Sequence, residues 1–397
     1  MRIAERIKRL GTETAFAVSG EAATFAAAGN KVFPYHLGDL NLKTPSTVVD
    51  GAFKAIADGK TGYCPNAGIP QLREAIAADV SASHHTAYAM ENVVVQPGGK
   101  PTIGKFLAAV MNPGDQVLYP NPGYPIYESQ IEYLGGEAVP YGYIEVEDNF
   151  ELDFEAIEGG ITERTRVLIL NDLQNPNGAE LSGDQRARLA DIVRRNDLLV
   201  LCDEAYFDMR YSGTSTSFVE EPDMAERSVI LYTFSKKFAM TGWRLGASIG
   251  PKDIVDVIAK INVNDESCTT HFIQYAGLAG LQRDQTEVRE ILAELERRRD
   301  AAAAGLNAIA GIRCIVPRAT FYLFPNVTNV MRRKGLTDYE EFRRAALHAT
   351  GVSFTTRRHF GRTLPNEPNQ YIRFAYSGIG VADIEESMAL FKGWCEA

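Results

Sequence analysis

The chain has 397 residues, of which 45% are hydrophobic and 23% charged, and its formal net charge is −10. Its basic residues are dispersed, which argues against the clustered basic face that a nucleic-acid partner requires, and no apolar run reaches the roughly 18 residues of a membrane span. Its five cysteines are scattered without a CxxC pair and its histidines lack metal-ligand spacing, so we expect a cytoplasmic protein with neither a disulfide framework nor a metal site.

Short apolar runs alternate with amphipathic segments of helical length over much of the chain. Strands are expected at 92–96, 116–119, 167–170, 198–202, 229–233 and 245–249, and helices at 101–111, 124–134 and 184–195. This alternation predicts an α/β fold with a mostly parallel sheet covered by helices on both faces. A long helix is expected at 286–308, and strands after it at 314–316, 321–324 and 371–374 indicate a separate, smaller lobe.

A lysine follows the strand expected at 229–233, within Thr233-Phe234-Ser235-Lys236-Lys237. Lysine becomes chemically useful when a site lowers its pKa or holds it as an imine. Arg244 follows in Met240-Thr241-Gly242-Trp243-Arg244. The hydroxyls of Thr233 and Ser235 and the guanidinium of Arg244 together could hold a dianionic phosphate.

An acid, Asp203, directly follows the strand expected at 198–202, in Asp203-Glu204-Ala205-Tyr206. A buried acid is costly unless it has a partner, and a pyridinium nitrogen would be such a partner. At an effective dielectric near 20, a charge pair about 4 Å apart gains roughly 4 kcal/mol, which is roughly three pKa units. Such a pair would keep a pyridine ring protonated and make it an electron sink.

Two glycine-containing turns follow other strands. Asn175-Pro176-Asn177-Gly178 is typical of a turn, in which the amide of Asn175 could also donate to a phenolate oxygen. Gln96-Pro97-Gly98-Gly99-Lys100 opens a helix, and backbone amides at a helix N-terminus form an anion site.

In this order and spacing, the motifs resemble the aspartate-aminotransferase superfamily of pyridoxal-phosphate enzymes, fold type I, classes I and II. The resemblance runs from about Gly38 to Arg373, and Ser235-Lys236-x3-Met240-x-Gly242-x-Arg244-x-Gly246 is its most specific segment. It implies a large domain over 46–290, with a mostly parallel seven-stranded sheet between helices, and a smaller α+β domain from 1–45 and 291–397. It also implies pyridoxal 5′-phosphate as the cofactor and ping-pong transfer of an amino group between an L-amino acid and a 2-oxo acid.

The resemblance further implies a role for each matching residue. Lys236 matches the Schiff-base lysine that also moves the substrate proton, and Asp203 matches the acid on the pyridine nitrogen. Asn175 and Tyr206 match the residues that hydrogen-bond O3′ of the cofactor, and Tyr124 matches the aromatic residue that stacks on its ring. The residues that match those around the cofactor phosphate are Gly99, Lys100, Thr233, Ser235 and Arg244. The substrate contacts match Arg373 and Gly38 at the α-carboxylate, with Asn175 beside them. Tyr63 matches a tyrosine that reaches the phosphate of a neighbouring subunit, which implies a homodimer.

Some alternatives stay open. The same fold and lysine serve β-lyases and ring-forming synthases. A nucleotide-binding P-loop is a poor second reading of Gly99 to Lys105, because Phe106 stands where Ser or Thr is needed. Tyr322 is one candidate for contact with the substrate side chain. The loop Arg357–His359 is another, and its arginines Arg357 and Arg358 belong either to a clamp for a distal carboxylate or to a solvated face, with the solvated face expected.

Overall fold

The central feature of the fold is a seven-stranded sheet with the strand order β2-β10-β9-β8-β7-β3-β4. The computed structural model describes residues 2–11, 14–365 and 367–397. The strands are β2 Val93–Gln96, β3 Gln116–Pro120, β4 Glu137–Tyr141, β7 Thr165–Leu170, β8 Leu199–Asp203, β9 Ser228–Thr233 and β10 Gly246–Ile249. Strand β10 runs antiparallel to both of its neighbours, β2 and β9, and the other strand pairs of this sheet are parallel. The predicted α/β class with a mostly parallel seven-stranded sheet is therefore confirmed.

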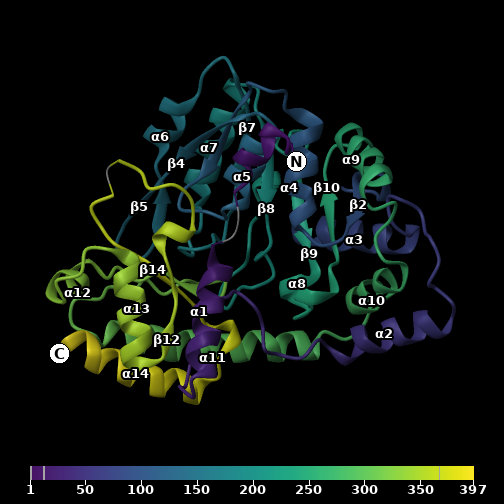
Figure 1. Ribbon diagram of the computed structural model, residues 1–397. Coiled ribbons are helices and arrows are strands. Elements are labelled where there is room, and N and C mark those ends of the chain that lie inside the picture. Colours follow the sequence, from purple (N-terminus) through teal and green to yellow (C-terminus); the bar gives the residue numbers. More distant parts are fainter. Residues whose placement is uncertain (1, 12–13, 366) are drawn as a thin grey trace.

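Helices cover both faces of this sheet because alternate strand residues point to opposite sides. In β2, the buried side chains of Val93 and Val95 join one hydrophobic cluster and that of Val94 joins another. The second cluster packs α4 Lys100–Val110, α5 Ile126–Tyr133 and α9 Lys252–Asp265 against the sheet. The first packs α2 Ser46–Ala57, α3 Pro70–Ser83, α6 Phe154–Gly160, α7 Gly183–Arg195 and α10 His271–Gln282. Figure 1 shows the helices on either side of the strands.

A third large hydrophobic cluster lies in the part of the molecule built from both ends of the chain. Its helices are α1 Ala15–Ala27, α11 Thr286–Asn307, α12 Thr328–Arg333, α13 Tyr339–Thr350 and α14 Val381–Glu396. Its strands are β1 Phe33–Pro34, β11 Tyr322–Leu323, β12 Val352–Ser353, β13 Thr355–Thr356 and β14 Ile372–Ala375. β1 pairs in parallel with β12, and Figure 1 shows the purple α1 beside the yellow C-terminal helices.

Most predicted elements are confirmed to within about two residues, but three differ. The strand expected at 314–316 is wrong, because both backbone groups of Cys314 bond to the side chain of Asn307. The strand expected at 321–324 is shorter, covering Tyr322–Leu323. The edge strand β4 was missed because it follows two glycines and contains Pro140, a residue that sheets tolerate at an edge. Two further short strands, β5 Tyr143–Glu145 and β6 Phe150–Leu152, form a separate antiparallel pair.

Within the described residues, no helix is both long and apolar enough to cross a membrane.

Candidate active site

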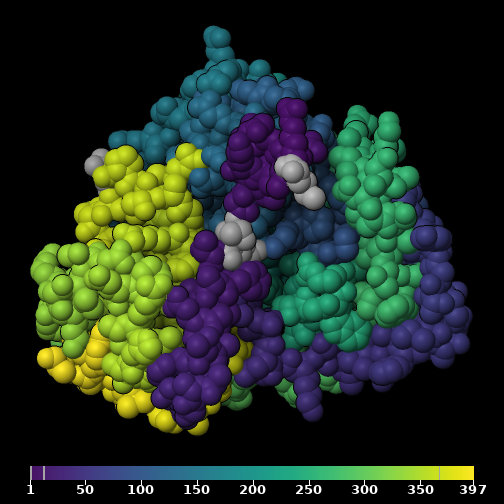
Figure 2. Space-filling view, in the orientation of Figure 1, coloured from purple at the N-terminus to yellow at the C-terminus, as the bar shows by residue number. Residues whose placement is uncertain are grey.

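A cavity of about 640 Å³ opens at the carboxyl ends of β8 and β9. The N-terminal segment lies across one face of the molecule (Figure 2), and Ala15 and Phe16 line the cavity. All but one of the site residues predicted from the sequence also line it: Gly38, Gly99, Lys100, Tyr124, Asn175, Asp203, Tyr206, Thr233, Ser235, Lys236, Arg244 and Arg373. The exception is Tyr63, which does not line the cavity and is 89% exposed.

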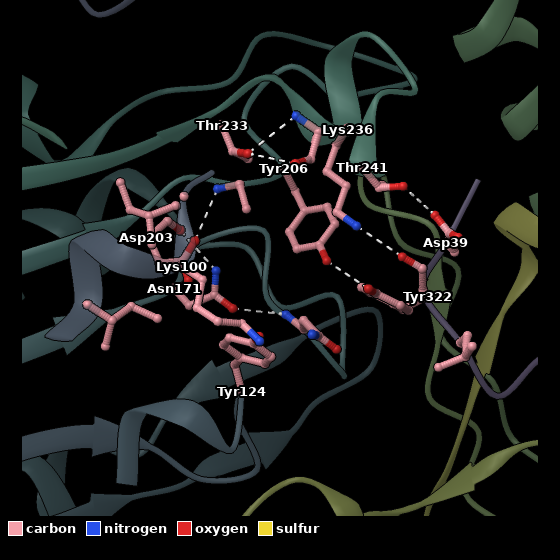
Figure 3. Close-up of a pocket in the computed structure, with 18 of the residues that line it drawn as sticks. Asp39, Lys100, Tyr124, Asn171, Asp203, Tyr206, Thr233, Lys236, Thr241 and Tyr322 are labelled. Atoms are coloured by element: carbon pink, nitrogen blue, oxygen red, sulfur yellow. Dashed lines mark hydrogen bonds between the residues drawn. The ribbon is translucent and has the colours of Figure 1, made fainter. Parts of the chain in front are cut away.

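Two adjacent lysines at the end of β9 have different environments. Both lie in the short helix α8, Phe234–Lys237. Lys236 points toward Tyr206 and Tyr322 (Figure 3), and its Nζ donates to the carbonyl oxygen of Gly38 at 2.9 Å. Lys237 does not line the cavity and pairs with carboxylates behind it. Of the two amines, therefore, the one that can react in the cavity is that of Lys236.

A buried carboxyl lies deep in the cavity at Asp203, the last residue of β8. Its Oδ2 accepts a hydrogen bond from the hydroxyl of Tyr127 at 2.5 Å, and its Oδ1 accepts from the backbone N–H of Ala205 at 3.2 Å. Burial raises the pKa of Asp203 to about 6, against the opposing effect of the Tyr127 hydrogen bond. A positive charge bound at this depth would stabilise the carboxylate and lower that pKa.

Tyr127 is a site residue that the sequence analysis missed. Its side chain is fully buried in α5, one turn after Tyr124. The available signal was that a buried tyrosine hydroxyl usually finds a polar partner, and the carboxyl end of β8 offers one.

Replacing Tyr127 by phenylalanine should raise the pKa of Asp203 in the ligand-free chain, because a hydrogen bond to the charged form is lost. Hydrogen bonds to charged groups contribute about 1.5–3 kcal/mol, so we expect a rise of about one pKa unit or more. Carbon-13 NMR of the Asp203 carboxyl across a pH titration measures it. Tyr119→Phe is the matched control, since the buried Tyr119 donates to Glu128 instead. Equal titration of Asp203 in both variants would contradict the assigned hydrogen bond.

Hydrogen-bond donors surround the end of the cavity where α4 begins, and we call this group the anion cradle: the turn at Gly98 and Gly99, with Thr233, Ser235 and Arg244. Gly98 has φ +99°, and a Cβ on it would lie 2.1 Å from a guanidinium nitrogen of Arg244. A Cβ on Gly99 would lie 2.6 Å from Leu231. Only glycine therefore lets the backbone amides at the N-terminus of α4 approach the hydroxyls and the guanidinium. Converging donors of this kind suit a dianionic phosphate.

The guanidinium of Arg373 is buried and also lines the cavity. Its Nη1 donates to Oδ1 of Asn175 and its Nη2 to the carbonyl oxygen of His36, each at 3.0 Å. The ring of Tyr322 lies 4.5 Å from the guanidinium carbon, and the Tyr322 hydroxyl is 2.7 Å from that of Tyr206. A guanidinium at this position suits a carboxylate, which it can bind through two N–H groups.

Gly38 is required beside this arginine for a steric reason. A Cβ at Gly38 would lie 2.1 Å from the hydroxyl of Tyr322. The backbone of the segment after β1 can therefore pass Tyr322 and present its carbonyl to Lys236 only because no side chain intervenes.

Arg357 and Arg358, the candidates for a distal-carboxylate clamp, both lie outside the cavity lining. Arg357 is buried and pairs with Glu367 at 2.5 Å and with the side-chain oxygen of Asn121 at 2.6 Å. The expectation that it faces solvent is therefore wrong, because Glu367 and the sequence-distant Asn121 turn it inward. Arg358 does lie at the surface, where it pairs with Asp338.

The cavity thus combines an amine, a buried acid, an anion cradle and a buried guanidinium.

Residues 36–389 match the protein family described as "Aminotransferase class I and II". The aspartate aminotransferase of Musicola paradisiaca is 30% identical, over 95% of this chain and 92% of that protein. A probable aspartate/prephenate aminotransferase of Rhizobium leguminosarum is also 30% identical, over 100% of this chain and 99% of that protein.

Solved structures agree with the sequence matches. A single mutant of Thermus thermophilus aspartate aminotransferase superposes with a TM-score of 0.90 and 26% identity, covering 99% of this chain and all of that one. The names of these relatives favour amino-group transfer over the β-lyase or synthase alternative. Since the family match spans most of the sequence, the chain belongs to the class I and II aminotransferases and is a pyridoxal-phosphate-dependent aminotransferase.

Proposed function

We propose that the chain moves an amino group between an acidic L-amino acid and a 2-oxo acid by a ping-pong mechanism. The observation that carries this proposal is that the amine of Lys236, the buried carboxyl of Asp203 and the anion cradle line one cavity. These groups fit the aldehyde, the ring nitrogen and the phosphate of pyridoxal phosphate, respectively. Arg373 lines the same cavity and fits the α-carboxylate of a substrate.

When bound, pyridoxal phosphate supplies an electron-withdrawing ring that accepts the electron pair left at the substrate Cα. Lys236 would hold the cofactor through Nζ and, once the substrate amine displaces it, would move the substrate Cα proton with that same nitrogen. Asp203 would keep the ring nitrogen protonated. Arg373 and Gly38 orient the substrate carboxylate, so that the Cα proton stays within reach of Lys236.

Three further side chains complete the assignment. Asn175 and Tyr206 would donate hydrogen bonds to the phenolic oxygen of the cofactor, and the ring of Tyr124 would stack on the cofactor ring. All three line the cavity. Tyr206 is held in position by Tyr322 through the contact between their hydroxyls.

The side chain of Lys100 supports an acidic substrate. The cations that line the cavity among the described residues are Lys100, Lys236, Arg244 and Arg373. In this assignment the last three bind the cofactor and the α-carboxylate. The ammonium of Lys100 lies 5.6 Å from the ring centroid of Tyr124, so its positive charge would attract a second carboxylate of a substrate bound beside that ring. Several relatives named aspartate aminotransferase support the same substrate class.

Lys100→Met should therefore change the choice of substrate. A charge-assisted hydrogen bond to a substrate carboxylate contributes about 1.5–3 kcal/mol, so kcat/KM for aspartate should fall about ten-fold or more while that for alanine stays within about three-fold. Steady-state assays with both amino acids measure it. Arg358→Ala is the control and should leave the ratio unchanged. Equal losses on both substrates would reject Lys100 as the specificity residue.

We also propose that the active unit is a homodimer in which Tyr63 completes the partner's anion cradle. Tyr63 is exposed in the single chain, as are Phe53 and Ile56 on α2 and Val263 on α9. Large exposed apolar side chains of this kind mark surfaces suited to a protein partner. A second copy of the chain would cover them and bring Tyr63 to a neighbouring site.

Mixing the inactive variants Tyr63→Ala and Lys236→Ala under subunit exchange should restore part of the activity. A hybrid dimer would carry both lesions at one site and leave the other site intact, so a random mixture should recover up to about a quarter of wild-type activity. Assays before and after exchange, with each variant alone as the control, measure it. No recovery despite proven exchange would show that Tyr63 does not act across the interface.

The proposal also covers the division into domains and the cellular location. The division into a large domain over 46–290 and a small one from 1–45 and 291–397 is supported by the separate hydrophobic cluster of the chain ends. A cytoplasmic location is supported by the five cysteines, all of which are free thiols.

A further inference from the structure

Lys237 has no place in the chemistry described so far, yet it is nearly buried and highly constrained. Its side chain is 13% exposed, and its Nζ lies 3.3 Å from Oδ2 of Asp79 on α3 and 3.2 Å from Oδ1 of Asp208, which follows β8. The hydroxyl of Tyr232 donates to the same oxygen of Asp79 at 2.9 Å. Although burial lowers the pKa of Lys237, the charges of Asp208 and Asp79 outweigh it and raise that pKa, so the amine stays charged.

The segment that carries Lys236 needs such an external constraint. Helix α8 spans only Phe234–Lys237, and so short a helix has almost no stability of its own. Phe234 and Phe238 are buried at its two ends, with their rings stacked. They hold the segment against the core, but rotation about the line that joins them would still redirect the side chain of Lys236.

The neighbouring side chain controls that rotation. Successive residues of a helix project about 100° apart, so the direction of Lys237 fixes the direction of Lys236. With Lys237 held by Asp79 and Asp208, Lys236 reaches the carbonyl oxygen of Gly38 inside the cavity. Two carboxylates from different elements specify one orientation.

A separate contact holds α3 to the loop after β8. Nε2 of His84, at the end of α3, lies 2.6 Å from Oε2 of Glu204, and both side chains are nearly inaccessible. The His84 ring also stacks on Phe207 at a centroid distance of 4.1 Å. Loss of the Lys237 contacts should therefore leave these elements in place.

The structure assigns Lys237 as a positioning residue: its ion pairs with Asp79 and Asp208 orient α8 so that the amine of Lys236 meets the cofactor and the substrate. This inference rests on the proposed function, since it assumes that Lys236 is the reacting amine. It adds that the orientation of that amine is determined by charged side chains outside the cavity, which do not contact the substrate.

Lys237→Met tests the assignment because it keeps an unbranched side chain and removes the charge. A misplacement of about 1 Å can cost about 100-fold in rate, so we expect kcat to fall about 10- to 100-fold while KM for the amino acid stays within about three-fold. Independently of turnover, the visible absorbance of the lysine-bound cofactor should develop about ten-fold more slowly when the apoenzyme is mixed with pyridoxal phosphate. Pyridoxamine phosphate has no aldehyde to react with Lys236 and should bind within about two-fold of wild type.

Three comparison variants complete the experiment. Lys237→Arg keeps the charge and should restore most of the rate. Asp79→Asn should reproduce the loss in part, and it provides the test if Lys237→Met fails to fold. Lys31→Met is the matched control, because Lys31 also pairs with two carboxylates, Asp383 and Glu386, but at the surface. It should leave every measurement unchanged.

Wild-type kcat and cofactor reaction rates in Lys237→Met would overturn the assignment. So would a parallel loss of pyridoxamine phosphate affinity, which would make Lys237 a general stabiliser of the site. Failure of the wild-type enzyme to join the cofactor at Lys236 is a different result, and would reject the proposed function instead.

Discussion

Asp203→Asn should lower kcat by about 1000-fold while the chain still folds and binds pyridoxal phosphate. A carboxylate–pyridinium pair about 4 Å apart is worth roughly 4 kcal/mol at an effective dielectric of 20, which corresponds to about three orders of magnitude in rate. Asparagine keeps the size of the side chain and an oxygen for the N–H of Ala205, and the anion cradle is untouched. Steady-state kinetics with the cofactor saturating would measure the loss.

The chain offers a matched control for this variant at the end of the neighbouring strand. Asp172 is also a carboxyl removed from bulk solvent, with its pKa raised by burial to about 7, but it does not line the cavity. Its Oδ1 accepts from the backbone N–H groups of Leu173 and Leu181, which an asparagine could still serve. Asp172→Asn should keep kcat within about three-fold of wild type. If Asp203→Asn were equally mild, Asp203 would not be the partner of the ring nitrogen.

Lys236→Ala should lower kcat by about 10⁴-fold or more, the largest effect expected in this protein. General acid–base catalysis alone contributes up to about 10⁴-fold, and the variant also loses the group that holds the cofactor. Methylamine in the buffer should restore part of the activity, because the truncated side chain leaves room for a free amine where Nζ lay. Asp203→Asn, which keeps its lysine, should gain nothing from methylamine. Activity in Lys236→Ala near that of wild type would exclude Lys236 as the proton carrier.

The sheet was predictable because its strands are short apolar runs that end at polar motifs. β8 and β9, for example, match their expected positions to within a residue. The edge strand β4 was not recognised, since Pro140 and the glycines before it are unfavourable for a central strand. The strand expected around Cys314 failed because the side chain of Asn307 takes the backbone bonds that a strand would use. Asn307 lies only seven residues before Cys314, but the pattern of apolar residues does not show that its side chain turns back to that backbone.

The site residues that lie at the ends of strands could be predicted from the sequence, because the strands themselves could be. Asp203 and Lys236 follow directly from the ends of β8 and β9, and parallel strands bring such residues to one edge of the sheet. Tyr127 was missed because a buried tyrosine in a helix looks like an ordinary core residue until its hydroxyl is seen to reach Asp203. Arg357 was misjudged because its guanidinium turns inward to Asn121, 236 residues earlier in the chain, as well as to Glu367. The pairing with Asn121 emerges only with the fold.

Lys236, rather than Lys237 or Lys100, should be the residue that binds the cofactor. Reduction of the enzyme with borohydride in the presence of pyridoxal phosphate, followed by proteolysis and mass spectrometry, tests this directly. We expect a single phosphopyridoxyl label on Lys236, whose Nζ lies in the cavity while that of Lys237 does not. A label on Lys237 or Lys100, or no label at all, would contradict it.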